Sequence, residues 1–284
     1  MSIQFSSLLP AHSRGKGGVF SVKSLDLEKL GVHASPVVVL DDFRISAHVF
    51  GPHPHAGFSA VTYVLEDSVG SARSRDSLGN DIVVGPGGIV WTLAGSGAMH
   101  EELPAEHGRE LHGLQIFVNL SAKNKLVAPQ VLWLDGKAVP EWRSAAGDRV
   151  RTVVGSYAGV SSPLLPAERF TMLDITLRGD LAFDLPPGHN ALVYVLHGIL
   201  SVSVDGRTQR IPREHALALY GEGGQVTFSA VNSPRFVVLS GAEIAEPVFK
   251  EGSFIMNDRA QTEAALARYQ GGKMGHLAPL NHLS

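Results

Sequence analysis

The sequence lacks cysteine altogether, so none of its 284 residues can form a disulfide, a thiolate zinc site, an iron–sulfur cluster or a cysteine nucleophile. It also lacks any apolar run of about 20 residues, the length that a membrane-spanning helix needs. Its start, MSIQFSSLLPAHSRGKGG, has no basic segment followed by an apolar one and does not resemble a signal peptide. These absences predict a cytoplasmic protein with no membrane partner.

An excess of charge of one sign is absent as well. The 24 Lys and Arg residues nearly balance the 27 Asp and Glu residues, which leaves a net charge of −3. No global basic field recruits nucleic acid, and we predict no direct contact with it. Aromatic residues are few, at 7%, whereas 31 glycines and 16 prolines are many for a helical protein. This composition favours short strands joined by tight turns.

Alternation of apolar and polar residues is the dominant pattern that the sequence does contain. Segments of four to six alternating residues are typical of strands, and the segments between them are rich in turn residues. The clearest strands are expected at residues 45–50, 60–65 and 114–118, and the turns at 76–81, 85–88 and 135–136. Regular short strands of this kind predict an all-β fold, either a barrel or a sandwich.

The strand pattern occurs twice. Ala-Val-Thr-Tyr-Val-Leu at 60–65 returns as Ala-Leu-Val-Tyr-Val-Leu at 191–196, an offset of 131 residues (191 minus 60). Val-Val-Gly-Pro at 83–86 is similarly echoed by Gln-Arg-Ile-Pro at 209–212, and each proline ends a strand. The order predicts two tandem β domains, residues 1–140 and 141–284, although two β-rich stretches can also look alike by chance.

One helix is expected, at residues 258–270 near the C-terminus. Asn257 can cap its start, and Gly271 and Gly272 can stop it. Its apolar side is expected to consist of Ala264, Leu266 and Ala267.

Two pairs of potential metal ligands lie 45 residues apart (100 minus 55). His53 and His55 stand in GPHPHAGF, and His100 and Glu102 stand in MHEE. Because a strand alternates faces, the members of each pair point the same way, whereas Glu101 points away. If both strands line one interior, three imidazoles and one carboxylate converge, which is costly without a cation. We therefore predict a metal site; the alternative is that these are unrelated surface residues.

The donor set restricts the metal. Three nitrogens and one oxygen suit Fe(II), Mn(II), Ni(II), Co(II) or Zn(II), whereas structural zinc usually recruits the cysteine that is missing here. Four protein ligands around an octahedral Fe(II) leave two open positions, enough for a bidentate substrate or for a substrate and oxygen. Gln115 is a further candidate to face the same cavity.

Several segments in order together resemble the pirin family of the cupin superfamily: GPHPHAGFSAVTYVLE, RDSLGN, GPGGIVWTLAGSGAMHEE, LHGLQIFVNL and the late FIMNDRAQTEAALARYQGGKMG. The resemblance implies two tandem jelly-roll barrels of the cupin type, the first of which binds iron through an H-x-H and an H-x-E motif. Carried over to this sequence, the ligands are His53, His55, His100 and Glu102, the same four that the spacing indicates. At the offset of 131, the first two fall on Asp184 and Pro186, so the second barrel is predicted to be a scaffold without metal.

The sequence departs from the family pattern near these motifs. Ala56 and Ser96 stand where many members have arginine, Ser74 where many have histidine, and Phe117 where tryptophan is frequent. None of these residues is a ligand, so the predicted metal site stands. The departures are expected to change the polarity around the metal and hence the substrate.

The resemblance implies one of two functions. Some pirins resemble quercetin 2,3-dioxygenases, which open a flavonol ring with O2. This implies an Fe(II) cofactor, with Mn, Ni, Co or Zn as substitutes, a small aromatic substrate such as a flavonol, and Glu102 as a catalytic base as well as a ligand. Other pirins resemble non-catalytic, iron-dependent redox sensors that act through protein partners, and the departures near the metal leave both functions open.

Overall fold

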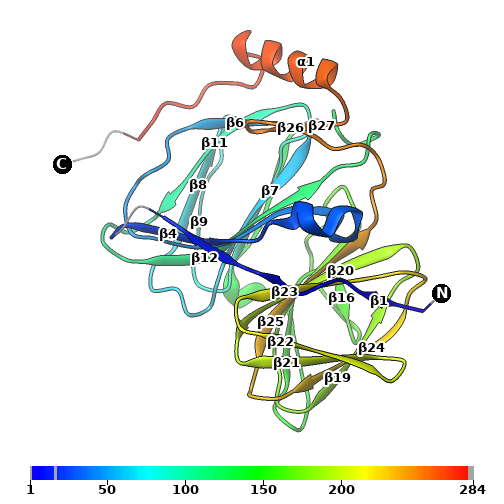
Figure 1. The fold of residues 1–284 in the computed structure, drawn as a ribbon. Coiled ribbons are helices and arrows are strands. Elements are labelled where there is room, and N and C mark those ends of the chain that lie inside the picture. The colour runs from blue at the N-terminus through cyan, green and yellow to red at the C-terminus, as the bar shows by residue number, and fades with distance from the viewer. Residues whose placement is uncertain (1, 16–17, 281–284) are drawn as a thin grey trace. The chain divides into compact units, whose positions relative to one another are not determined.

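The structure is a computed structural model that describes residues 2–15 and 18–280. The chain divides into two compact units, which are described separately. The unit of residues 14–22, 41–138 and 246–284 is called the first barrel, and that of residues 1–13, 23–40 and 139–245 the second barrel. Strands dominate both (Figure 1). Within the described residues, no helix combines the length and apolarity that crossing a membrane requires.

The first barrel is built from two sheets, whose strands are β3 (His12–Arg14), β4 (Phe20–Ser24), β5 (Val37–Ile45), β6 (His53–His55), β7 (Phe58–Val64), β8 (Ala72–Asp76), β9 (Asp81–Val84), β10 (Ile89–Leu93), β11 (Ala98–Pro104), β12 (Leu111–Asn119) and β13 (Gln130–Leu134). The larger sheet has the order β13-β10-β7-β12-β5-β4-β3, and the smaller sheet has the order β6-β11-β8-β9. A short 3-10 helix, η2 (Gly136–Ala138), follows β13. The turns between these strands use glycine, for example Gly87 at φ 80° between β9 and β10.

The second barrel repeats this arrangement with the strands β1 (Gln4–Phe5), β2 (Leu9–Pro10), β14 (Glu141–Arg143), β15 (Arg149–Val154), β16 (Ser156–Tyr157), β17 (Val160–Ser161), β18 (Phe170–Thr176), β19 (Asp180–Leu185), β20 (His189–His197), β21 (Ile199–Val204), β22 (Arg207–Pro212), β23 (His215–Tyr220), β24 (Gly224–Ala230) and β25 (Arg235–Ala242). Its larger sheet has the order β1-β23-β20-β25-β18-β15-β14, and its smaller sheet has the order β19-β24-β21-β22. The 3-10 helix η1 (Leu27–Ala34) belongs to this unit.

The strand orders confirm the predicted internal repeat. In the first barrel β10, β7, β12 and β5 lie side by side, and in the second barrel β23, β20, β25 and β18 take the same places. The two similar hexapeptides at residues 60–65 and 191–196 lie largely in β7 and β20, the central strands of their sheets. The predicted fold, two tandem jelly-roll barrels with a short C-terminal helix, is confirmed.

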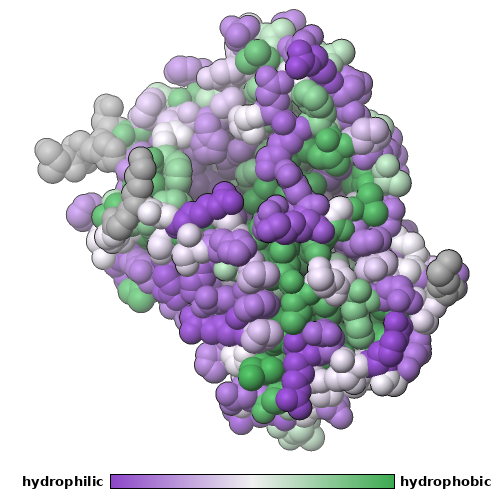
Figure 2. Space-filling view, in the orientation of Figure 1, coloured by the Kyte–Doolittle hydropathy of each residue, from purple (hydrophilic) through white to green (hydrophobic). Residues whose placement is uncertain are grey.

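Each barrel contains packed apolar side chains. In the second barrel they come from both of its sheets and include Phe183, Phe228 and Phe236, whose neighbouring rings lie 5.2–5.9 Å apart. In the first barrel one apolar cluster includes Val64, Val84 and Val90, and a cavity lies beside it. On the outside, hydrophilic side chains cover much of the visible surface, as Figure 2 shows.

Each barrel contains chain from the distant end of the sequence. Strand β1 at the N-terminus pairs with β23 in the second barrel, where Gln4 lies opposite Tyr220. Residues 246–284 belong to the first barrel, with the strands β26 (Phe249–Glu251) and β27 (Phe254–Met256) and the helix α1 (Arg259–Gln270). The units are thus not the linear segments 1–140 and 141–284, because strand pairing and packing draw each terminus into the other half.

Lys125 holds the C-terminal segment of the first barrel in place. Its ammonium group is buried and donates to the carbonyl oxygens of Gly57 and Ile255, each at 2.9 Å, and to the side-chain oxygen of Asn119. A buried charge requires such a set of acceptors. The lysine consequently ties the loop after β6 to strand β27.

The strand expected at residues 45–50 is wrong. Strand β5 ends at Ile45, and Val49 and Phe50 are 42% and 47% exposed. Phe50 instead packs edge-on against Phe20, with ring centroids 5.2 Å apart. The alternating pattern predicted a strand here, but a loop residue such as Phe50 can also pack its apolar side chain against a barrel without belonging to a strand.

The helix is confirmed, but two details of it differ. Asp258 rather than Asn257 is the N-cap, and its carboxylate accepts from the backbone N–H of Gln261 at 2.8 Å. The buried residues of the helix are Thr262 and Ala265, whereas Leu266 is 42% exposed. The expected apolar side is therefore wrong: the helix packs through the small Ala265, which joins a buried cluster with residues of the C-terminal segment.

Candidate metal centre

Strands β6 and β11 bring the three predicted histidines together. The strands pair antiparallel, so that His100 lies opposite His53 and Ala98 lies opposite His55. The Nε2 atoms of His53 and His100 are 3.1 Å apart, and the three ring centroids are separated by 4.5–4.8 Å. One ring nitrogen from each histidine lies within 4.8 Å of the others, which confirms that the two motifs converge.

Hydrogen bonds set the orientation of two of these rings. His53 Nδ1 lies 2.9 Å from the carbonyl oxygen of Gly51, and His55 Nδ1 lies 3.4 Å from that of Ser253. A carbonyl oxygen only accepts, so Nδ1 carries the hydrogen and Nε2 carries the lone pair in each ring. Metal-binding histidines are commonly oriented in this way by a hydrogen bond from the other nitrogen.

His100 completes the group. Its Nδ1 is buried and has no hydrogen-bond partner among the described residues, and its Nε2 faces that of His53. In the metal-free arrangement His100 Nε2–H donates to His53 Nε2. If the hydrogen of His100 lies on Nδ1 instead, all three Nε2 lone pairs face one another, and a divalent cation would give them a common partner, so these residues fit a metal ion.

Burial keeps the imidazoles in the form that binds metals. Burial, and then the neighbouring His53, lower the pKa of His55 to about 3. Burial also lowers the pKa of His100 well below its usual value, and His55 and His53 add to this effect. Both rings are therefore neutral at physiological pH without first releasing a proton.

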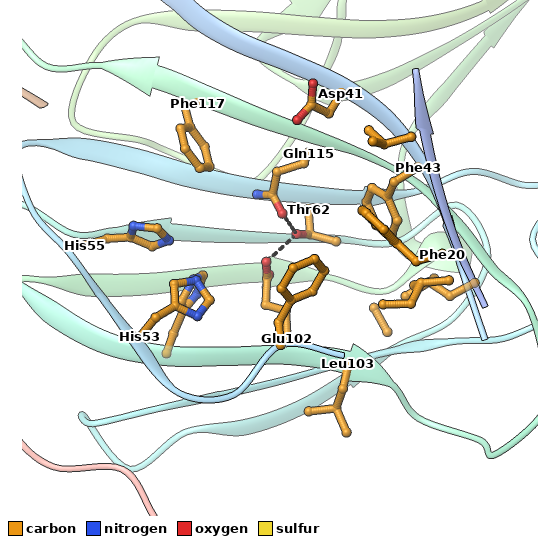
Figure 3. Close-up of a pocket in the computed structure, with 16 residues that line it drawn as sticks. Phe20, Asp41, Phe43, His53, His55, Thr62, Glu102, Leu103, Gln115 and Phe117 are labelled. Atoms are coloured by element: carbon orange, nitrogen blue, oxygen red, sulfur yellow. Dashed lines mark hydrogen bonds between the residues drawn. The ribbon is translucent and has the colours of Figure 1, made fainter. Parts of the chain in front are cut away.

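Glu102 occupies the same side of β11 as His100 but lies apart from the histidine group. Its Oε2 accepts a hydrogen bond from Thr62 Oγ1 at 2.8 Å, and the same hydroxyl lies 3.3 Å from Gln115 Oε1 (Figure 3). Burial raises the pKa of Glu102 to about 7, and the hydrogen bond from Thr62 acts against this rise. The structure thus groups three of the four predicted ligands, and coordination by Glu102 stays a prediction.

Glu101 points to the opposite face of β11, as the alternation predicts. Its carboxylate is fully buried, lies 2.9 Å from His48 Nε2 and accepts from Arg75 Nη1 at 2.7 Å. Arg75 also donates to the backbone carbonyl of Ala278, at 3.3 Å. Arg75 therefore connects strand β11, through its ion pair with Glu101, to the C-terminal segment, through its hydrogen bond to Ala278.

A cavity of about 210 Å³ extends from the histidines into the first barrel. The histidines lie at one side of it in Figure 3, and Phe20 and Phe43 lie at the other. Its lining is mostly apolar: Phe20, Val22, Phe43, Ile45, Phe50, Ala72, Leu103, Leu111 and Phe117. Polar groups are contributed by Asp41, Thr62, Glu102 and Gln115, so the expectation for Gln115 is confirmed.

Two of the departures from the family pattern lie elsewhere than expected. Ala56 is fully buried and pairs with Phe254 of the C-terminal segment, and the carbonyl of Ser96 accepts from Arg268 Nε at 2.9 Å. Neither residue lines the cavity. The expectation that they change the polarity around the metal is wrong, because both face the C-terminal segment. Ser74 does not line the cavity either, so Phe117 alone among the four departures does.

Comparison with known families agrees with the geometry. Residues 19–118 match the model of the Pirin family, and residues 172–275 match that of the Pirin C-terminal cupin domain. The chain belongs to the pirin family. This pirin is 34% identical over 249 residues to a Pseudomonas aeruginosa protein named provisionally as a quercetin 2,3-dioxygenase, and the match covers 84% of this chain and 86% of that protein. It is 31% identical over 245 residues to human pirin, covering 84% and 83% of the two chains.

Solved structures show the same architecture. A quercetin 2,3-dioxygenase from Acinetobacter baumannii is 26% identical and superposes on this pirin with a TM-score of 0.86, over 98% of this chain and all of that one. A bacterial pirin from Escherichia coli in complex with nickel(II) is 21% identical and superposes with a TM-score of 0.65, over 84% and 99% of the chains. The second likeness shows the fold alone.

Sequence reasoning missed Thr62, Asp41 and Phe43 in the cavity wall. Thr62 lies in β7, where every residue is buried, and the other two lie in β5. A signal for Thr62 was available, since a hydroxyl in a strand buried on both faces needs a polar partner. The arrangement as a whole can bind a metal, orient a small ligand beside it and accept a proton from that ligand.

Proposed function

We propose that this pirin is a metal-dependent dioxygenase of hydroxylated aromatic compounds, with flavonols of the quercetin type as the reference substrates. One observation carries the proposal: three imidazoles aim ring nitrogens at one point beside an apolar cavity. The dioxygenase names of the Pseudomonas and Acinetobacter relatives support it.

His53, His55, His100 and Glu102 would hold the metal, which we propose is Fe(II), with Mn, Ni, Co or Zn as substitutes. When bound, Fe(II) supplies Lewis acidity toward a substrate hydroxyl and reactivity with O2. The protein keeps two of the imidazoles neutral through burial and keeps water out through the apolar wall. Glu102 lines the cavity beside the histidines, so its carboxyl group would also accept the proton of a substrate hydroxyl.

The polar groups beside the metal site have separate tasks. Thr62 donates to Glu102 and so fixes the orientation of its carboxyl group in the cavity wall. Gln115 donates to the carbonyl of Val61 at 3.1 Å, which fixes its amide in the wall. The first barrel, which contains the metal site, would carry the activity. The second barrel, whose core is packed with apolar side chains, would serve as a scaffold without metal.

A non-catalytic, iron-dependent regulator that acts through a protein partner is the second candidate. The ion pair of Glu101 with Arg75, and the hydrogen bond from Arg75 to Ala278, favour it. Oxidation of the metal from Fe(II) to Fe(III) adds a positive charge next to this buried pair, and the pair leads to the C-terminal segment. Such a path could report the redox state of the metal to a partner.

Oxygen consumption separates the two candidates. Protein loaded anaerobically with Fe(II) is mixed with quercetin or with 4-methylcatechol in aerated buffer, and O2 uptake and aromatic absorbance are followed together. The dioxygenase predicts joint loss of O2 and of at least one aromatic compound, which His100→Ala abolishes. His112→Gln is the matched control, since His112 is also buried in the first barrel but lies outside the cavity lining. Fully loaded protein that consumes no O2 with either compound would leave the regulator as the better proposal.

A further inference from the structure

Two histidines of the candidate metal site differ in what orients their rings. The Nδ1 of His53 donates to the carbonyl oxygen of Gly51, two residues earlier in the chain. The Nδ1 of His55 instead donates to the carbonyl oxygen of Ser253, which is 198 residues away in the C-terminal segment. The orientation of His53 is therefore determined locally, whereas that of His55 depends on where the C-terminal segment lies.

The position of Ser253 is set by the hairpin of strands β26 and β27, whose turn contains this residue. Each strand has three residues, and an isolated two-stranded hairpin is at best marginally stable in water. The hairpin is attached to the residue after β6, because Ala56 and Phe254 form a parallel bridge. The backbone N–H of Ile255 also donates to the carbonyl oxygen of Ala56, at 3.0 Å. The hairpin thus takes its place from the residues next to His55.

Gly57 allows a close approach between these two segments. Its φ of 83° lies in the left-handed region, and a Cβ atom at this position would lie 2.0 Å from the carbonyl oxygen of Ile255. Any larger residue would have to push the hairpin away. The loop after β6 and strand β27 therefore lie closer together than a side chain at residue 57 would permit.

Lys125 joins the two segments through their carbonyl oxygens. Its buried ammonium group donates to Gly57 and to Ile255, each at 2.9 Å, and to the side-chain oxygen of Asn119 at the end of β12. Burying this charge costs desolvation energy that an apolar side chain would not cost. An apolar side chain, however, cannot hold two carbonyl oxygens at hydrogen-bond distance from one atom. Lys125 consequently fixes the spacing between the loop after β6 and strand β27.

This spacing matters because the hydrogen bond from His55 to Ser253 is long. Its 3.4 Å exceeds the usual range of about 2.7–3.2 Å, so a further displacement of about 0.3 Å is enough to break it. Without this acceptor the hydrogen of the neutral ring can move to Nε2, which then has no lone pair for a metal. Loss of such an orienting partner typically lowers metal affinity about 10–100-fold.

We propose that Lys125 is a positioning residue of the metal site: it places the Ser253 carbonyl group that keeps the Nε2 lone pair of His55 available to the metal. This inference rests on the proposed metal site and adds to it a requirement for the C-terminal segment. A change at Lys125 should act on His55 and leave His53 as it is, because the acceptor of His53 belongs to its own loop.

Metal affinity tests this role. Co(II) binding to chelator-treated protein at neutral pH is measured by competition with a chromophoric chelator, and the visible spectrum of bound Co(II) reports its ligands. Lys125→Met should weaken Co(II) binding about 10–100-fold and change the spectrum. Val90→Ala is the matched control, since it removes buried apolar atoms from the same barrel outside the cavity lining and should cost stability without affinity. Unchanged affinity of folded Lys125→Met, or an equal loss in Val90→Ala, would overturn the proposal.

The position of the ring hydrogen gives a readout that general destabilisation would not move. Nitrogen-15 NMR of the metal-free protein at neutral pH distinguishes Nδ1–H from Nε2–H in each neutral imidazole. In Lys125→Met the signals of His55 should shift toward the Nε2–H form, while those of His53 should match the unmodified protein. Unchanged His55 signals, or equal shifts of both histidines, would contradict a specific effect on His55.

Gly57→Ala reaches the same contact without changing the lysine and serves if Lys125→Met does not fold. The added Cβ would push against Ile255, so Co(II) affinity should fall and the His55 signals should shift in the same direction. Gly79→Ala is its control: Gly79 also has a positive φ, of 95°, but no atom of the described residues lies within 4 Å of an added Cβ. Equal behaviour of the two glycine variants would overturn the role of the contact. Unmodified protein that binds no Co(II) would refute the proposed metal site, and the His55 signals of the variants would still decide whether Lys125 positions this ring.

Discussion

Replacing His55 by glutamine should make the metal-free protein less sensitive to acid. Burial, and then the neighbouring His53, lower the pKa of this imidazole from 6.5 to about 3 in the folded state. Between these two values the unfolded chain binds a proton at this position that the folded chain does not bind. Stability from the neutral imidazole is therefore present above pH 6.5 and is lost progressively as the pH falls toward 3.

The size of the effect follows from the shift. At pH 5, which is 1.5 units below 6.5, the loss is about 2 kcal/mol at 1.36 kcal/mol for each unit. Glu102 acts in the opposite direction, because burial raises its pKa from 4.5 to about 7. Its stabilising contribution is present below pH 4.5 and is lost as the pH rises through 7, so the pH curve of the natural protein mixes both effects.

The difference between two proteins isolates the histidine. Urea unfolding of chelator-treated protein, followed by circular dichroism at pH 7 and pH 5, should show His55→Gln gaining about 2 kcal/mol relative to the unmodified protein at the lower pH. His107→Gln removes an exposed imidazole from the same barrel and should follow the unmodified protein. An unchanged difference between His55→Gln and the unmodified protein at the two pH values would refute the reasoning, since the imidazole would then be protonated freely in the folded state.

Three further outcomes are expected. Burial lowers the pKa of His112, but hydrogen bonds to Asp42 and Asp67 outweigh burial and raise the pKa above 6.5. The stabilising contribution of His112 is therefore present below pH 6.5 and is lost as the pH rises through the raised pKa. Urea unfolding of His112→Gln should show about 2 kcal/mol of destabilisation at pH 6 and clearly less at pH 9. Lys125→Met leaves three buried acceptors without their donor and should lower the free energy of unfolding by at least about 3 kcal/mol, so a loss below about 1 kcal/mol in the same assay would contradict the role of the lysine. Elemental analysis should find one metal ion per chain in the unmodified protein and in Glu101→Gln, but none in His100→Ala; two ions per chain would contradict the scaffold role of the second barrel.

The metal site could be predicted from the sequence because its geometry is local. Residues at i and i+2 share a face in any strand, so His53 and His55 had to point the same way, and Glu101 had to turn away from His100. The pairing of His100 with His53 could not be predicted in this manner, since the register between two strands depends on contacts between distant segments. Family resemblance, rather than spacing, supplied that link.

The cavity wall was harder to predict than the ligands. Strand β7 is buried along its whole length, so no alternation distinguishes the side that carries Thr62. Asp41 and Asp42 are adjacent and chemically identical, yet one lines the cavity and the other binds His112. Only the fold decides between them. The position of the helix N-cap could not be predicted to within one residue either: the backbone makes Asp258, not Asn257, the N-cap.

The exchange of chain ends between the barrels determines when a newly made chain can assemble the histidine group. His55 leaves the ribosome early, but Lys125 and the loop after β6 need a carbonyl group from Ile255, which is translated 200 residues later (255 minus 55). At about 5–20 residues per second, this delay lasts about 10–40 s. During this time the first barrel lacks strand β27 and the acceptor that Ile255 provides to Lys125. The histidine group is thus expected to take its final arrangement only after Ile255 has been made.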